Sequence, residues 1–243
     1  MTLKELLEII HNVAKSNGLA TPYVCGGTPR DKLVNNIKYV PDIDITTGNS
    51  DINELGKKSA TVLGNIAKYI DLKTHAHIIV GNFSVDLSTN YVNPHIINSK
   101  APDIIKETYS RDFTCNALLM STDLSTIYDP TKKGIKDINN KIIRTCLSVE
   151  KSLNAEAELN KRIVRAIYLA SKLGFDIDPE IISWVKNHPE KIANCSQQFL
   201  SEKLSKAMKF DKIKTLGLLD QMGVWKYVPP IPELKPYIAQ GRF

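Results

Sequence analysis

The sequence predicts an α+β domain followed by an all-α region, and three observations lead to this fold class. Short apolar runs with the two-residue period of a strand occur from Tyr23 onward, up to about Cys146. From there to Gly223 the apolar residues follow helical spacing, and no segment has a convincing strand pattern. The chain has 243 residues, enough for two small domains that each bury a core. We therefore predict a first domain at residues 1–146 and a helical domain at residues 147–243.

The first elements follow from local patterns. Leu3 to Lys15 carries apolar residues at helical spacing, and Gly18 lies just past its end. A short apolar run, Tyr23 to Cys25, predicts a strand that ends at a pair of glycines. After the glycines, Thr28 is predicted to cap a helix that has Pro29 in its first turn.

The next elements alternate between strands and helices. Residues 42–47 alternate acidic and β-branched side chains, which predicts a strand, and residues 51–63 have a helical pattern. Ile78 to Val80 and Phe83 to Leu87 flank Gly81-Asn82, which predicts a β-hairpin with a two-residue turn. Residues 90–102 are predicted to form a loop, and residues 114–120 a helix or a strand. That segment is expected to end at residues 127–130, and residues 142–144 are predicted to form the final strand.

Composition excludes several classes of protein. The four cysteines form no C-x-x-C pair, which argues against a zinc ribbon and a disulfide scaffold. No run reaches the roughly 18 apolar residues that span a bilayer, and the N-terminus lacks the pattern of a signal peptide. We expect a cytoplasmic protein without a membrane partner. A net charge of +6 suits an anionic partner such as RNA, although many other proteins share it.

Asp42-Ile43-Asp44 is the central chemical feature. On a strand the two aspartates share one face, while Ile43 points to the core. Neighbouring carboxylates repel each other unless a cation lies between them, and oxygen ligands favour Mg²⁺ or Mn²⁺. Two such ions about 4 Å apart could activate a 3′ hydroxyl and stabilise a leaving pyrophosphate. The motif is also common on solvated strand faces, so alone it is weak evidence.

A glycine pair precedes the predicted second helix. Gly26 and Gly27 would let the backbone approach a triphosphate closely, and the following helix offers N–H groups at its start. Arg30 could donate two hydrogen bonds to phosphate oxygens, and Asp31 is expected to hold Arg30 or the loop in place rather than to take part in the chemistry. A simple tight turn is the alternative.

Segments along the chain then match a family pattern in order and spacing. They are Tyr23–Asp31 with Asp42–Thr46, Ser110–Leu118, Tyr128–Asp137 with Asn140–Arg144, and Lys161–Ile167 with Leu173–Phe175. Together they resemble the motifs of class II tRNA nucleotidyltransferases (CCA-adding enzymes) and bacterial poly(A) polymerases. The resemblance implies a polymerase β-like nucleotidyltransferase head with a mixed β-sheet, followed by an all-α neck and a reduced body.

The resemblance also implies roles for individual residues. Asp42 and Asp44 would bind Mg²⁺ or Mn²⁺, and Asp86 would be the third catalytic carboxylate, unless it is a polar residue on the outer face of the hairpin. Eight residues would bind the nucleotide, namely Gly26, Gly27, Arg30, Arg111, Asp112, Asn116, Arg162 and Arg165. The alternatives are a local surface ion pair for Arg111 and Asp112, and a solvated helix face for the last two arginines.

Four positions depart from the family pattern. The acidic residue that selects the base falls on Leu159, and the third neck arginine falls on Tyr168. Two further arginines fall on Tyr91 and Ser110. Because Leu159 cannot accept a hydrogen bond from a base, base selection is more in doubt than catalysis.

The implied activity is the addition of CCA, or part of it, to the 3′ end of tRNA or another RNA from CTP and ATP. A poly(A) polymerase or a relaxed terminal transferase is an alternative within the family. A non-catalytic RNA-binding relative, and a nucleotidyltransferase acting on a protein or small molecule, are alternatives of other classes. The helical end could also support a homodimer.

Other candidates are weaker. His75 and His77 would share a face of an extended segment and could bind a metal. No third ligand lies near them in the sequence, so we predict ordinary polar roles. Trp184 and Trp225 are predicted to fill the core rather than to stack on bases.

Overall fold

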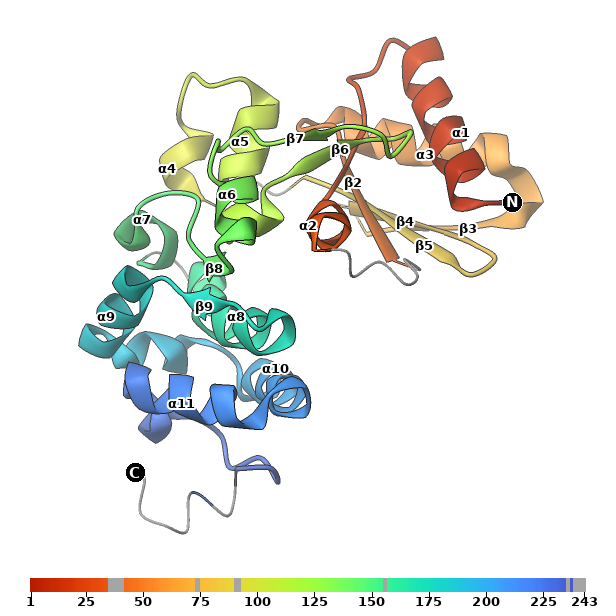
Figure 1. The fold of residues 1–243 in the computed structure, drawn as a ribbon. Helices are drawn as coiled ribbons and strands as arrows, with labels where there is room; N and C mark the ends of the chain where they lie inside the picture. The colour runs from red at the N-terminus through yellow and green to blue at the C-terminus, as the bar shows by residue number, and fades with distance from the viewer. Residues whose placement is uncertain (35–41, 73–74, 90–92, 155–156, 235–236, 238–243) are drawn as a thin grey trace. The chain divides into compact units, whose positions relative to one another are not determined.

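The computed structural model of the chain describes residues 1–34, 42–72, 75–89, 93–154, 157–234 and 237 (Figure 1). The chain divides into two compact units, Met1–Ile138 and Asn139–Phe243. The first mixes helices with strands and the second is almost entirely helical, so the α+β fold class is confirmed. The domain boundary at residue 146 stays a prediction.

The first unit contains most of the strands. Its elements are α1 (Leu3–Ser16), β1 (Tyr23–Cys25), α2 (Gly27–Leu33), β2 (Asp42–Thr46), α3 (Asp51–Leu63), η1 (Gly64–Ile66), β3 (Ala67–Asp71), β4 (His75–Val80), β5 (Phe83–Ser88), α4 (Pro94–Ile97), α5 (Asp103–Tyr109), η2 (Thr114–Asn116), β6 (Leu119–Ser121), β7 (Ile127–Tyr128) and α6 (Gly134–Asn139). The predicted hairpin is confirmed, since Val80 pairs with Phe83 across a two-residue turn.

The sheet of this unit is mixed, as expected. Its seven strands lie in the order β3-β4-β5-β2-β1-β6-β7. Neighbouring strands run antiparallel except β2 and β5, which run parallel. The parallel pair brings together two segments that are far apart in the sequence, because α3, β3 and β4 lie between them along the chain.

One face of the sheet is buried beneath α1 and α3 (Figure 1). Apolar side chains on these helices pack against the inward-facing residues of the strands, and the main contributors are Leu6, Leu7, Ile10, Ile52, Leu55, Ile43, Ile45, Ile78, Val85 and Leu87. Because strand side chains alternate, every second residue of β2, β4 and β5 points away from this core. The opposite face of the sheet is therefore the face that can carry polar chemistry.

Three local predictions differ from the structure. Helix α2 begins at Gly27 with Gly26 in the cap position, so Thr28 lies inside the helix and does not cap it. Strand β3 was missing from the predictions, because its exposed and half-buried residues lack a clear apolar face. The segment predicted as a loop at residues 90–102 contains α4, which the Asn93 side chain caps. Tyr91 lies outside the described residues.

The second unit is built around one long helix. Its elements are β8 (Ile142–Ile143), α7 (Val149–Leu153), α8 (Ala157–Leu173), β9 (Asp176–Ile177), α9 (Pro179–Asn187), η3 (Pro189–Asn194), α10 (Gln197–Phe210), α11 (Lys212–Met222) and η4 (Trp225–Tyr227). Helix α8 packs against α10 and α11 through buried Ile163, Val164, Ile167, Leu200, Leu204 and Leu219. Trp225 is buried as predicted, whereas Trp184 is only half-buried and stacks on His188.

The final strand predicted at residues 142–144 is confirmed by β8, whereas β9 is a short strand within the region that was expected to be all-α. β8 and β9 pair in parallel over two residues each. The Asp178 backbone N–H donates to the Ile143 carbonyl at 3.0 Å, and the Asp178 side chain pairs with Arg144. A strand this short has no periodicity to detect in the sequence. Within the described ranges, no helix is both long and apolar enough to cross a membrane.

Candidate active site

Three carboxylates lie on the face of the sheet that is opposite α1 and α3. Asp42 and Asp44 are exposed on β2, while Ile43 between them is buried. Asp44 lies opposite Asp86 in the parallel pairing of β2 with β5. Directly opposed residues on neighbouring strands, which are about 4.8 Å apart, point to the same face. The strands therefore bring together the three aspartates that the sequence singles out, while their catalytic roles stay predictions.

The donor set of this face fits a hard divalent cation. Carboxylate oxygens are the ligands that Mg²⁺ and Mn²⁺ prefer, and three acidic side chains on adjacent strands supply them. Asp86 also has one carboxylate oxygen, Oδ1, that is buried without a hydrogen-bond partner. A buried polar atom of this kind is costly unless a ligand satisfies it.

Gly26 lies directly against the side chain of Asp44. Its φ angle is +71°, a conformation that other residues rarely adopt. A Cβ atom at this position would overlap Oδ2 of Asp44 and would lie 3.6 Å from Nη1 of Arg111. The glycine is thus required both by its backbone angle and by the close approach of Asp44, and it places the start of α2 next to that side chain.

Arg30 links α2 to η2. The residue is 3% exposed, and its guanidinium binds Asp31 through Nε and Nη2 at 2.7 and 2.6 Å. Nη1 donates to Oδ1 of Asn116, and the Asn116 amide donates to Oδ1 of Asp112 at 3.0 Å. The role predicted for Asp31, holding Arg30 in place, is confirmed. The network orients Arg30, Asp112 and Asn116, and their contacts to a nucleotide stay predictions.

Arg111 forms a buried ion pair. Its partner is Glu107, one helical turn earlier on α5 and 0% exposed, and Nη2 also donates to Sγ of Cys25 at 3.0 Å. The alternative of a surface ion pair between Arg111 and Asp112 is therefore wrong. Nε of Arg111 is buried without a hydrogen-bond partner, so the side chain has a donor that a ligand could use.

The electrostatics around Arg111 keep the guanidinium charged. Burial by itself would lower the pKa of Arg111, but its neighbours, among them the carboxylates of Glu107 and Asp44, raise it above its ordinary value. Burial also raises the pKa of the Cys25 thiol to about 12, so the thiol is neutral. A fixed positive charge therefore lies beside Asp44. Sequence reasoning missed Glu107, although its position four residues before Arg111 was a signal for an ion pair.

The predicted base-selecting residues lie on α8 in the second unit. Arg162 is buried and donates to the Ser152 carbonyl at 3.4 Å, whereas Arg165 is exposed. The solvated-face alternative therefore applies to Arg165 alone. Leu159 is 1% exposed within the helical core. Tyr168 is half-buried, and Nζ of Lys203 lies 5.5 Å from its ring centroid. The roles of the two arginines in nucleotide binding stay predictions.

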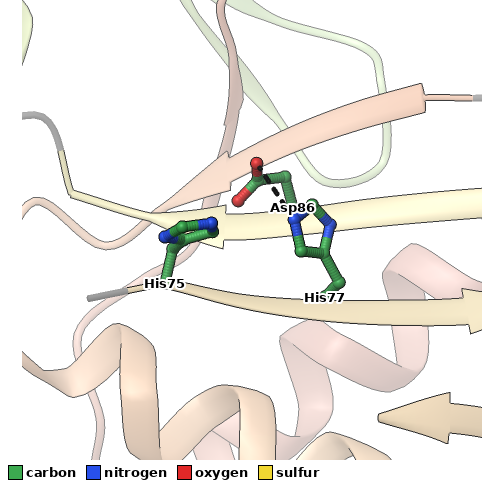
Figure 2. A group of neighbouring side chains, drawn as sticks. All are labelled: His75, His77 and Asp86. Carbon is green, nitrogen blue, oxygen red and sulfur yellow. Dashed lines mark ion pairs between the residues drawn. The ribbon is translucent and has the colours of Figure 1, made fainter. Parts of the chain in front are cut away.

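The expectation that His75 and His77 lack a third ligand is wrong. Figure 2 shows both imidazoles on β4 beside Asp86 of β5. In the hairpin register His77 lies directly opposite Asp86, so the side chains share a face. The register was the available signal, because a two-residue turn at Gly81-Asn82 fixes which residues oppose each other.

Comparison with known proteins gives consistent matches. The sequence profile of the poly A polymerase head domain matches residues 22–144. The CCA-adding enzyme of Staphylococcus aureus is 25% identical over 232 residues, which cover 88% of this chain and 52% of that protein. The tRNA nucleotidyltransferase of Schizosaccharomyces pombe is 28% identical over 251 residues, which cover 92% of this chain and 49% of that protein. The chain thus spans about half the length of these curated relatives.

A solved structure supports the fold. The CCA-adding enzyme of Bacillus stearothermophilus in complex with CTP superimposes with a TM-score of 0.76 at 23% identity, over 100% of this chain and 58% of that one. The likeness shows that the two proteins share a fold. Since the head-domain profile covers half of the sequence, including all three sheet carboxylates, this chain belongs to the poly A polymerase head domain family.

Proposed function

We propose that the protein is an RNA 3′-terminal nucleotidyltransferase that adds CCA, or part of it, to tRNA from CTP and ATP. The observation that carries the proposal is the face of β2 and β5, which bears Asp42, Asp44 and Asp86 and on which Asp44 lies close to Gly26 and Arg111. The similarity to proteins named CCA-adding enzyme and tRNA nucleotidyltransferase supports the choice of substrate class.

The carboxylates would hold the divalent ions of the reaction. Asp42 and Asp44 are the proposed ligands, with Asp86 as the third carboxylate, and Mg²⁺ or Mn²⁺ fits their oxygen donors. When bound, such ions make the 3′ hydroxyl of the RNA more nucleophilic and stabilise the charge of the leaving pyrophosphate. The chain itself contributes the fixed geometry of the ligands, because β2 and β5 are inner strands of the sheet.

The groups around the carboxylates are proposed to bind the nucleotide. The backbone at Gly26 and Gly27 would approach the triphosphate, and Arg30 and Arg111 would donate to its oxygens. Asp112 would accept from a ribose 2′ hydroxyl, which distinguishes ribonucleotides from deoxyribonucleotides. Its Oδ1 already accepts from Asn116 and from the Phe113 backbone N–H, and these bonds fix its orientation.

Base selection is the part of the reaction that separates the family alternatives. Leu159 is buried and has no hydrogen-bonding atom on its side chain. A site without an acceptor there loses one of the contacts that distinguish C and A from other bases. A poly(A) polymerase or a relaxed terminal transferase is therefore the second candidate. With no acceptor at Leu159, the residues of α8 that we propose to contact the nucleotide are Arg162 and Arg165.

The proposal is tested by incorporation of labelled nucleotides. Purified protein with Mg²⁺ is incubated with each labelled NTP and a tRNA transcript that lacks its 3′ CCA, beside a generic RNA. Addition of C, C and A identifies a CCA-adding enzyme, one added base indicates a partial activity, and a long A tract indicates a poly(A) polymerase. If neither RNA is extended at any Mg²⁺ or Mn²⁺ concentration, the proposal fails and an RNA-binding role replaces it.

Gly26→Ala is expected to lower both the stability of the protein and the rate of nucleotide incorporation. The strained backbone angle should cost about 1–2 kcal/mol of unfolding free energy. The added methyl group must also displace Asp44, so we expect at least a tenfold loss of rate. Unfolding in urea and nucleotide incorporation measure the two effects.

Gly64→Ala provides the matched control for this prediction. Gly64 has backbone angles close to those of Gly26, with φ +55° and ψ −137° against +71° and −127°, but a Cβ atom there would meet nothing within 4 Å. The control should lose similar stability and keep its activity. Equal activity of the two variants would show that the contact between Gly26 and Asp44 has no role in the reaction.

A further inference from the structure

A second set of possible metal ligands lies on the same sheet face as the carboxylates. His75 and His77 alternate along β4 with Ala76 and Ile78, which are buried, so both imidazoles point away from the core. In the register of the sheet, His77 opposes Asp86, and Asp86 opposes Asp44. The histidines thus extend the acidic face by one more strand.

The ligand atoms of this cluster are already close together. One atom from each of His75, His77 and Asp86 lies within 4.8 Å of the others (Figure 2). Nε2 of His77 is 3.8 Å from Oδ2 of Asp86, and the two imidazole centroids are 5.4 Å apart. Ligands of a tetrahedral zinc ion are about 3.3 Å apart, given bonds of about 2.05 Å. Small side-chain rotations would be enough to reach that spacing.

The chemistry of the cluster differs from that of the carboxylate pair. Two imidazole nitrogens and one carboxylate favour borderline ions such as Zn²⁺, Fe²⁺ or Co²⁺, whereas Mg²⁺ prefers oxygen ligands. All three side chains are half-buried, which leaves room for an ion with water as a further ligand. Oδ1 of Asp86 is buried without a hydrogen-bond partner, so this carboxylate has an oxygen that could bind an ion.

We propose that His75, His77 and Asp86 bind one divalent transition ion of the zinc class. The site contains neither Asp42 nor Asp44, but it includes Asp86, the proposed third catalytic carboxylate, so an ion held by the histidines would fix the position of that carboxylate. Binding of the ion does not depend on the proposed nucleotidyltransferase activity. Only the effect of the ion on catalysis rests on that proposal.

Co²⁺ is the probe for this site, because its visible absorption reports low-coordinate binding to nitrogen. The full chain, freed of metal with a chelator, is titrated with Co²⁺ alone and followed by absorbance and calorimetry. We expect one Co²⁺ per chain that gives this absorption, and its affinity should fall at least about tenfold in His75→Ala and in His77→Ala. Excess Zn²⁺ should abolish the absorption, while excess Mg²⁺ should leave most of it.

Two further variants make the result decisive. His95→Ala removes an exposed histidine of α4 and should bind Co²⁺ like the wild type. Asp44→Asn should keep the Co²⁺ absorption, because Asp44 is not part of the histidine site. Circular dichroism confirms that each variant is folded. The inference is overturned if wild-type protein binds no Co²⁺, if His77→Ala binds it unchanged, or if Asp44→Asn removes binding while His77→Ala does not.

Discussion

Asp44→Asn is expected to lower nucleotide incorporation by at least about a thousandfold while leaving the protein folded. Asp44 is exposed on β2, lies opposite Asp86, and is close to Gly26 and Arg111. Asparagine keeps the shape of the side chain but removes the negative charge and one oxygen that a divalent ion needs. The loss should therefore appear in the rate, with little change in unfolding.

The measurement is the rate of incorporation into tRNA at saturating NTP, together with urea unfolding. Asp71→Asn, at an exposed position on β3 of the same sheet, is the matched control. Its ion pair with Lys57 is exposed and is worth little, so activity should stay within about twofold of the wild type. A wild-type rate in Asp44→Asn would place the chemistry elsewhere in the molecule.

Arg111→Met is expected to lower the free energy of unfolding by about 3–5 kcal/mol. Glu107 is completely buried, and Arg111 supplies the guanidinium that compensates its charge. Methionine fills part of the space but removes the guanidinium that pairs with the buried carboxylate. Because Arg111 also lies near Asp44, incorporation should fall even under conditions where the variant is fully folded.

The double variant Glu107→Gln/Arg111→Met separates the ion pair from simple packing. Removing both charges should recover much of the lost stability, because no uncompensated charge remains. Arg165→Met removes an exposed arginine of α8 and should change stability by no more than about 0.5 kcal/mol. If the double variant were no more stable than Arg111→Met, the buried charge would not be the cause of the loss.

The sequence is sufficient to predict the elements of the site but not all of its contacts. That Asp42 and Asp44 share a face follows from strand periodicity alone. That Asp86 lies beside Asp44 depends on the parallel pairing of β2 and β5, which is a property of strand order and has no local signal. In the same way, the spacing of Glu107 and Arg111 indicates a pair, but only the fold shows that the pair is buried.

The errors have local physical causes. Thr28 has the chemistry of a helix cap, but the positive φ angle at Gly26 starts the helix before it is reached. The third ligand of the histidine cluster is nine residues away from His77 in sequence and is brought close only by the hairpin. Counting pairs back from the predicted two-residue turn would have placed Asp86 opposite His77.

The parallel pairing of β2 with β5 also has a consequence for folding kinetics. To pair these two strands, the chain must close a loop that contains α3, β3 and β4. Closing such a loop lowers the entropy of the chain before the strands make any stabilising contact. The β4-β5 hairpin, by contrast, can form locally. During synthesis the histidine cluster could therefore assemble first, and the three carboxylates would meet only once β2 has joined the finished hairpin.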